Sequence, residues 1–134
     1  MRASIINIQS YIFYLIPISL LTGPFLPDLF LSIVSIIFVI ISIKERTWKY
    51  YKNNFFLIFV IFYLILIIVS LKAEFKINSI ENSFFYFRFG IFSLTTWFLI
   101  NEKVNFIRNF TIIFLITFLL ALFDGYFQYF YNSN

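Results

Sequence analysis

The most constraining feature of this sequence is an uninterrupted apolar run from Phe55 to Leu71 that carries no charged residue. About 20 helical residues cover the roughly 30 Å hydrocarbon core of a bilayer. Four further apolar stretches follow the same pattern, and they cover residues 5–21, 30–43, 84–100 and 109–123. The second extends back toward Phe25 and the fifth forward through Tyr131. We therefore predict an all-α, polytopic bundle of about five transmembrane helices.

Composition agrees with a membrane location. Only 12% of the 134 residues are charged, and 62% are hydrophobic, whereas soluble chains carry roughly 25% charged residues. The chain has no Cys and no His, which removes disulfides, thiolate metal sites and the commonest general base. We accordingly expect no metal, no cofactor and no catalytic residue within this chain.

Basic residues set the predicted topology. With a cytoplasmic N-terminus, seven of the ten Lys and Arg residues lie inside: Arg2, Lys44, Arg46, Lys49, Lys52, Lys103 and Arg108. This distribution follows the positive-inside rule. The basic, aromatic loop 44–54 therefore indicates topology and lipid contact, and we expect no nucleic-acid partner. Residues 22–28 form an outer turn, and Lys72–Ser83 an outer polar loop. The first apolar stretch lacks a cleavage pattern and is predicted to be a transmembrane helix, not a signal peptide.

Arg88 is a charged residue inside the fourth apolar stretch, near its predicted outer end. Charges within membrane helices are costly and often functional. Its side chain could reach the outer headgroups by snorkelling, or it could bind an anion such as phosphate through its planar guanidinium. Both interpretations stay open at this point.

The fifth stretch contains a polar stripe. Thr117, Ala121, Asp124 and Gln128 follow one another at spacings of four, three and four, which places them on one helix face. A small, polar stripe most often packs against another helix. We interpret Thr117, Asp124 and Gln128 as structural, and we add the hypothesis of an Arg88–Asp124 ion pair.

Four segments carry a family resemblance: PISLLTGPF at 17–25, IKERTWKYYKN at 43–53, FRFGIF at 87–92 and LALFDGYFQYF at 120–130. In this order they resemble the N-terminal part of the O-antigen ligase and polymerase family. The resemblance implies a bacterial inner-membrane glycosyltransferase, metal-independent and inverting. Such an enzyme moves a glycan from undecaprenyl diphosphate to lipid A-core or another acceptor on the periplasmic side. By this analogy, Arg88 would help to hold the diphosphate.

Family members continue into further helices and a large periplasmic loop that bears a histidine. We therefore expect residues 1–134 to be a single transmembrane domain, the N-terminal part of a longer enzyme and inactive alone. The expected partners are membrane lipids and the lipid-linked glycan donor. The alternative is a small transporter or accessory membrane protein that is complete at this length. The reading frame downstream of Asn134 would discriminate between the two.

Overall fold

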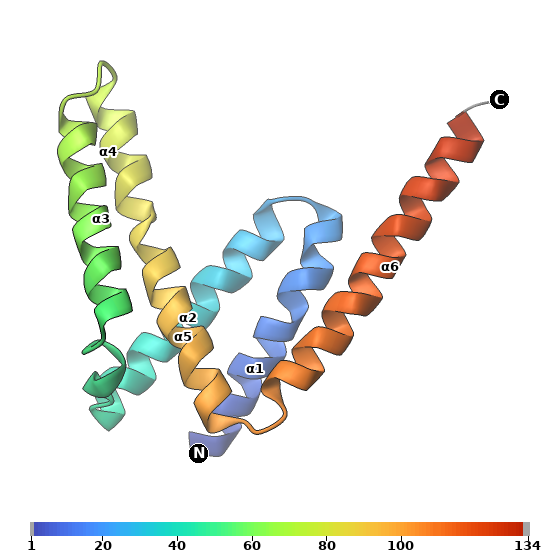
Figure 1. Ribbon diagram of the computed structural model, residues 1–134, viewed down its shortest axis with the longest axis horizontal. Coiled ribbons are helices and arrows are strands. Elements are labelled where there is room, and N and C mark those ends of the chain that lie inside the picture. Colours follow the sequence, from blue (N-terminus) through green and yellow to red (C-terminus); the bar gives the residue numbers. More distant parts are fainter. Residues whose placement is uncertain (1, 133–134) are drawn as a thin grey trace. The chain divides into compact units, whose positions relative to one another are not determined.

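The computed structural model describes residues 2–132, and these residues form helices and short connections without a β-strand (Figure 1). The helices are α1 (Arg2–Ser19), α2 (Phe25–Glu45), α3 (Asn54–Leu71), α4 (Lys76–Phe85), α5 (Phe87–Glu102) and α6 (Phe106–Asn132). Two 3₁₀ turns, η1 (Leu20–Thr22) and η2 (Trp48–Tyr50), follow α1 and α2.

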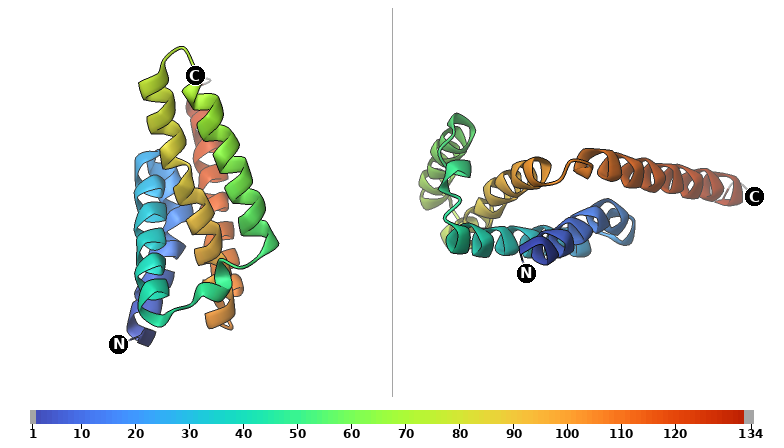
Figure 2. Two further views of the ribbon diagram at one scale, coloured as in Figure 1. Left: turned by 90° about the vertical axis from the view of Figure 1, so that its left-hand side faces the viewer. Right: turned by 90° about the horizontal axis from the view of Figure 1, so that it is seen from below.

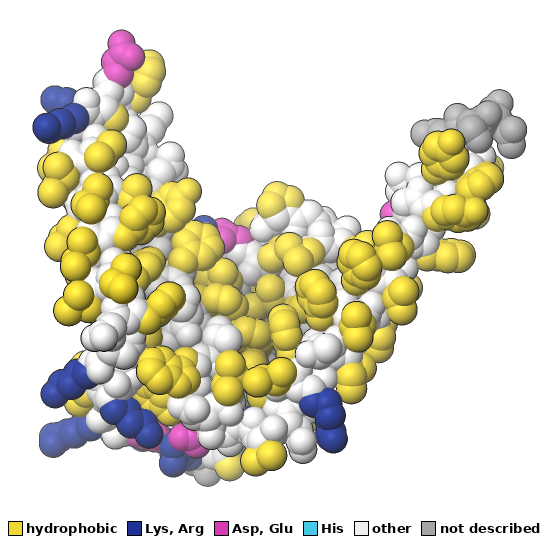
Figure 3. All heavy atoms as spheres, in the orientation of Figure 1, with side chains coloured by type: hydrophobic (Ala, Val, Ile, Leu, Met, Phe, Trp, Pro, Cys, Tyr) yellow, Lys and Arg dark blue, Asp and Glu magenta, His cyan; other side chains and the backbone are white. Residues whose placement is uncertain are grey.

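Five helical stretches are long and apolar enough to cross a membrane. They are Arg2–Thr22, Phe25–Glu45, Asn54–Leu71, Lys76–Glu102 and Phe106–Tyr131. The predicted all-α fold with about five spanning helices is confirmed. Figure 3 shows the expected surface, because apolar side chains cover the length of α3 whereas Lys and Arg side chains gather near its ends.

Two compact units share the chain. A terminal unit comprises Met1–Leu31 and Leu99–Asn134, and a central unit comprises Ser32–Phe98. Both divisions lie inside helices, because α2 and α5 each continue from one unit into the other. The single transmembrane domain stays a prediction.

Local signals explain the helix ends. Gly23 has a φ of +115°, which a residue with a Cβ rarely adopts, so the chain turns there and α2 begins two residues later. Pro27 lies in the first turn of α2, where a proline is tolerated. At the other end of α2, Arg46 has a φ of +53° and the Thr47 N–H donates to the Ser42 carbonyl oxygen at 3.2 Å. This is the left-handed ending that closes many helices.

Asn53 is the last residue of the connection 46–53 between α2 and α3. Its Oδ1 accepts from the Phe56 N–H at 2.7 Å, as an N-cap side chain does. Its Nδ2 donates to the Tyr50 carbonyl oxygen at 2.6 Å. Tyr50 is only 3% exposed, and its ring lies 5.6 Å from Phe98 and 5.9 Å from Trp97. The loop is thus anchored to α5 by a buried aromatic residue.

The predicted outer loop Lys72–Ser83 is wrong over most of its length. Helix α4 begins at Lys76, so only residues 72–75 connect it to α3, and the two helices lie side by side (Figures 1 and 2). The segment contains no Gly or Pro, and Ile77, Ile80 and Phe84 recur at helical spacing. The Ser70 and Ser83 hydroxyls form a hydrogen bond between α3 and α4. Helix-compatible spacing therefore outweighed polarity in this segment.

Helices α1 and α6 form the core of the terminal unit. The Phe13 ring lies 5.1 Å from Phe106 and 5.5 Å from Phe110, both edge-on. Tyr14 stacks on Phe106 at 5.4 Å. At the start of α1, the Arg2 guanidinium pairs with the Glu102 carboxylate at 2.8 Å. In Figure 1 both α1 and α6 rise from the lower side, so the first and fifth helical stretches run parallel, as the three stretches between them require.

Candidate functional site

Arg88 lies at the junction between α4 and α5. Tyr86 separates the two helices, and its N–H donates to the Ser83 carbonyl oxygen at 3.2 Å. Arg88 is the second residue of α5 and lies near the middle of the apolar stretch Lys76–Glu102. Arg88 was expected about one helical turn from the end of a span that starts at Phe84. It lies farther from the end of its helical stretch than that, because the stretch begins at Lys76.

Aromatic rings surround the Arg88 side chain, which is half-buried. Its guanidinium carbon lies 5.2 Å from the centre of the Phe89 ring and 6.0 Å from that of Phe85. Both distances fall within the range of cation–π attraction, which offsets part of the cost of a charge in an apolar setting.

Helix α3 fixes the position of this junction. The Phe87 ring lies 5.2 Å from Tyr63 and 6.3 Å from Phe59, and the backbone of Gly90 lies directly against the Phe59 ring. One turn further along α5, Thr95 is fully buried and donates to the Ile91 carbonyl oxygen at 2.9 Å. The start of α5 is thus clamped to α3, and with it the backbone of Arg88.

The polar stripe of α6 divides into two parts. Thr117 is buried and donates to the Ile113 carbonyl oxygen at 2.9 Å, whereas Ala121, Asp124 and Gln128 are exposed. The Gln128 Nε2 donates to the Asp124 carboxylate at 2.9 Å. All side chains from 118 to 131 are exposed. Because Arg88 belongs to the central unit and Asp124 to the terminal unit, their ion pair stays a prediction.

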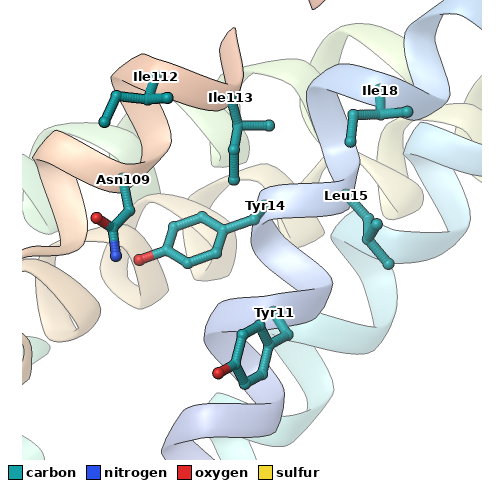
Figure 4. A pocket seen from close by; sticks show the side chains of 7 residues that line it. All are labelled: Tyr11, Tyr14, Leu15, Ile18, Asn109, Ile112 and Ile113. Atoms are coloured by element: carbon teal, nitrogen blue, oxygen red, sulfur yellow. The ribbon is translucent and has the colours of Figure 1, made fainter. Parts of the chain in front are cut away.

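A second pair of polar side chains, between α1 and α6, was not predicted from the sequence. The side chains of Tyr14 and Asn109 lie against each other between α1 and α6. Figure 4 shows the Asn109 amide beside the Tyr14 hydroxyl, in a hollow lined by both helices. The available signal was Asn109 itself, a strongly polar residue at the start of an apolar stretch. Its partner could not be inferred, because the two positions are far apart in the sequence.

Candidate metal ligands are dispersed in the described part of the chain. Within residues 2–132, no three or more Asp and Glu side chains gather into a group that could hold a metal ion. The two candidate sites in the described part of the chain are the Arg88 junction and the hollow between α1 and α6.

Comparison of the chain with protein-family models, curated proteins and solved structures finds no match. The family resemblance described above accordingly stays a prediction.

Proposed function

We propose that this chain is the membrane portion of a bacterial O-antigen ligase-like glycan transferase. It would lie in the inner membrane with its N-terminus in the cytoplasm. It would act on a glycan linked to undecaprenyl diphosphate and transfer it to lipid A-core or another periplasmic acceptor. Five helices of spanning length support a membrane location, and the four segments quoted in the sequence analysis support this family.

The observation that carries the proposal is the setting of Arg88. A guanidinium deep in a span and flanked by Phe85 and Phe89 is a costly feature that packing alone does not require. Its planar fork can bind two oxygens of a phosphate at once, and a medium of low polarity strengthens this contact. A lipid-linked diphosphate brings such oxygens to a membrane helix.

Deletion of the gene in its host tests the proposal. The lipid-linked glycan should accumulate and the glycosylated acceptor should disappear, as measured by mass spectrometry of lipid extracts and gel analysis of the surface glycan. Return of the gene with Arg88→Ala should fail to restore transfer, and Arg88→Lys should restore it only weakly because the fork is lost. Lys76→Ala, which removes a cation at the start of α4, should restore it fully. Unchanged glycan lipids in the deletion strain would refute the proposal.

The Arg88–Asp124 ion pair is a separate proposal with its own test. If the two residues pair, Arg88→Ala and Asp124→Ala should each lower the unfolding midpoint in detergent. The double variant should then be no less stable than either single variant. Strictly additive losses would rule out the pair and would leave the role of Arg88 in diphosphate binding untouched.

A further inference from the structure

The hollow between α1 and α6 continues into a second one at its lower-numbered end. The first has a volume of about 450 Å³, and Figure 4 shows its lining side chains: Tyr11, Tyr14, Leu15, Ile18, Asn109, Ile112 and Ile113. The second, of about 300 Å³, adds the connection from Lys103 to Phe106 and shares Tyr11, Tyr14 and Asn109 with the first. Together they form one groove, here called the α1–α6 groove.

Polarity changes along this groove. One end holds Lys103, whose ammonium lies 5.8 Å from the centre of the Tyr11 ring, together with Asn105. The adjacent Tyr14 and Asn109 side chains, which line both hollows, mark the middle. Beyond them, Leu15, Ile18, Ile112 and Ile113 make the remaining wall apolar. A ligand that fits has one charged end and one hydrocarbon end.

The apolar part of the groove is shorter than one leaflet. From Tyr11 to Ile18 the helix rises about 10 Å, whereas half of a hydrocarbon core measures about 15 Å. Leu15, Ile18 and Ile112 are each 44–50% exposed, so the apolar end opens sideways toward the lipid. An acyl chain of one leaflet could enter there without leaving the bilayer.

Charge at the polar end favours an anion. Glu102 is the acidic residue beside Lys103, and its carboxylate pairs with the Arg2 guanidinium at 2.8 Å. The ammonium of Lys103 is therefore not neutralised by that neighbour. On the predicted topology this end faces the cytoplasm, where anionic phospholipids give the leaflet a negative potential.

We propose that the α1–α6 groove binds one anionic glycerophospholipid of the cytoplasmic leaflet. Lys103 and Asn105 contact the headgroup phosphate, and one acyl chain lies along Leu15, Ile18 and Ile113. This site is distinct from the proposed diphosphate site, because its lining comes from α1, α6 and the connection before α6, whereas Arg88 belongs to α5. It does not depend on the glycan transferase proposal.

Native mass spectrometry of the full chain, released from nanodiscs of equal phosphatidylglycerol and phosphatidylcholine with matched acyl chains, tests the site. The protein should retain one phosphatidylglycerol. Lys103→Gln should weaken its retention about fivefold, since one Lys near the surface is worth roughly that factor. The matched control Lys76→Gln should leave retention unchanged. Equal retention of both lipids, or no loss with Lys103→Gln, would overturn the proposal.

A second measurement locates the acyl chain independently of any change in folding. A phosphatidylglycerol with a photoreactive acyl chain should label peptides of α1 and α6 in the unmodified protein, and Ile113→Trp, which fills the groove, should abolish that labelling. Labels confined to α3 would refute the assignment. The chain has no native Cys, so an Ile112→Cys variant adds a clean check. Efficient disulfide dimers in the membrane would assign the groove to a second copy of the chain and overturn lipid binding.

Discussion

Substitution of Gly90 by alanine measures how tightly α5 is held against α3. A Cβ atom built at Gly90 meets three atoms of the Phe59 ring, all inside contact distance. That ring cannot move away easily, because it stacks between Phe56 and Tyr63 at 6.3 Å on either side. Accommodation of the methyl group must therefore displace the aromatic stack or the helix.

The magnitude follows from a comparison with Gly125, a helical glycine whose Cβ would meet no atom within 4 Å. Replacement of a helical glycine by alanine gains up to about 1 kcal/mol in helix propensity, and both variants share this gain. Overpacking costs about 1–3 kcal/mol, and only Gly90→Ala incurs it. We expect Gly90→Ala to be less stable than Gly125→Ala by about 1–3 kcal/mol.

Equilibrium unfolding in mixed micelles of a mild detergent and SDS, followed by circular dichroism, provides the two free energies. In a Phe59→Ala background the ring is absent, so the added cost of Gly90→Ala should fall close to zero. Equal stabilities of the two glycine variants would refute the close α3–α5 contact. A cost of Gly90→Ala that persists without the Phe59 ring would show that the backbone of α5, not this contact, is the cause.

Three further predictions concern the central unit and the topology. Ser83→Ala removes the partner of Ser70 and should lower the unfolding free energy by about 0.6 kcal/mol, the average for hydrogen bonds between membrane helices; a loss above 2 kcal/mol in the same SDS titration would contradict that reasoning. Tyr50→Ala removes a ring that is 3% exposed and should lower the unfolding free energy by about 3 kcal/mol. It should also make the connection 46–53 sensitive to protease, and resistance of that connection in limited proteolysis would argue against the anchoring role of Tyr50. In inverted membrane vesicles, which expose the cytoplasmic face, Lys52→Cys should react with a membrane-impermeant maleimide and Asn78→Cys should not; the opposite pattern would reverse the predicted topology.

Hydrophobic length was sufficient to predict five helical stretches long and apolar enough to cross a membrane. The run Phe55–Leu71 corresponds closely to α3, Asn54–Leu71, because nothing but a helix can satisfy the backbone of an uncharged apolar stretch in lipid. The same reasoning failed at Lys76–Phe85, where polarity predicted a loop and the spacing of Ile77, Ile80 and Phe84 allowed a helix. The gap between the predicted stretches 84–100 and 109–123 was also too long, because only residues 103–105 separate α5 from α6.

Pairs between distant helices could not be predicted. Each such pair depends on which helix faces meet, as in Arg2 with Glu102, Ser70 with Ser83 and Tyr14 with Asn109. Hydrophobic periodicity gives little information about those faces in α3 and α6, where apolar residues surround the helix on all sides. The candidate residues Arg88 and Asp124 were visible in the sequence only because charges are rare within the spans.

Hydroxyl residues and charged residues of the helical stretches differ in the interactions that their side chains make. Three buried hydroxyls donate within their own helix: Ser10 to the Ile6 carbonyl oxygen at 2.7 Å, Thr95 to that of Ile91 at 2.9 Å and Thr117 to that of Ile113 at 2.9 Å. Such residues permit close packing and need no partner elsewhere. Arg88 differs from these residues, because its guanidinium lies against the rings of Phe85 and Phe89 and brings a positive charge into the apolar stretch Lys76–Glu102. The diphosphate contact that we propose would use this charge, and the Arg88→Lys variant separates the contribution of the charge from that of the planar guanidinium.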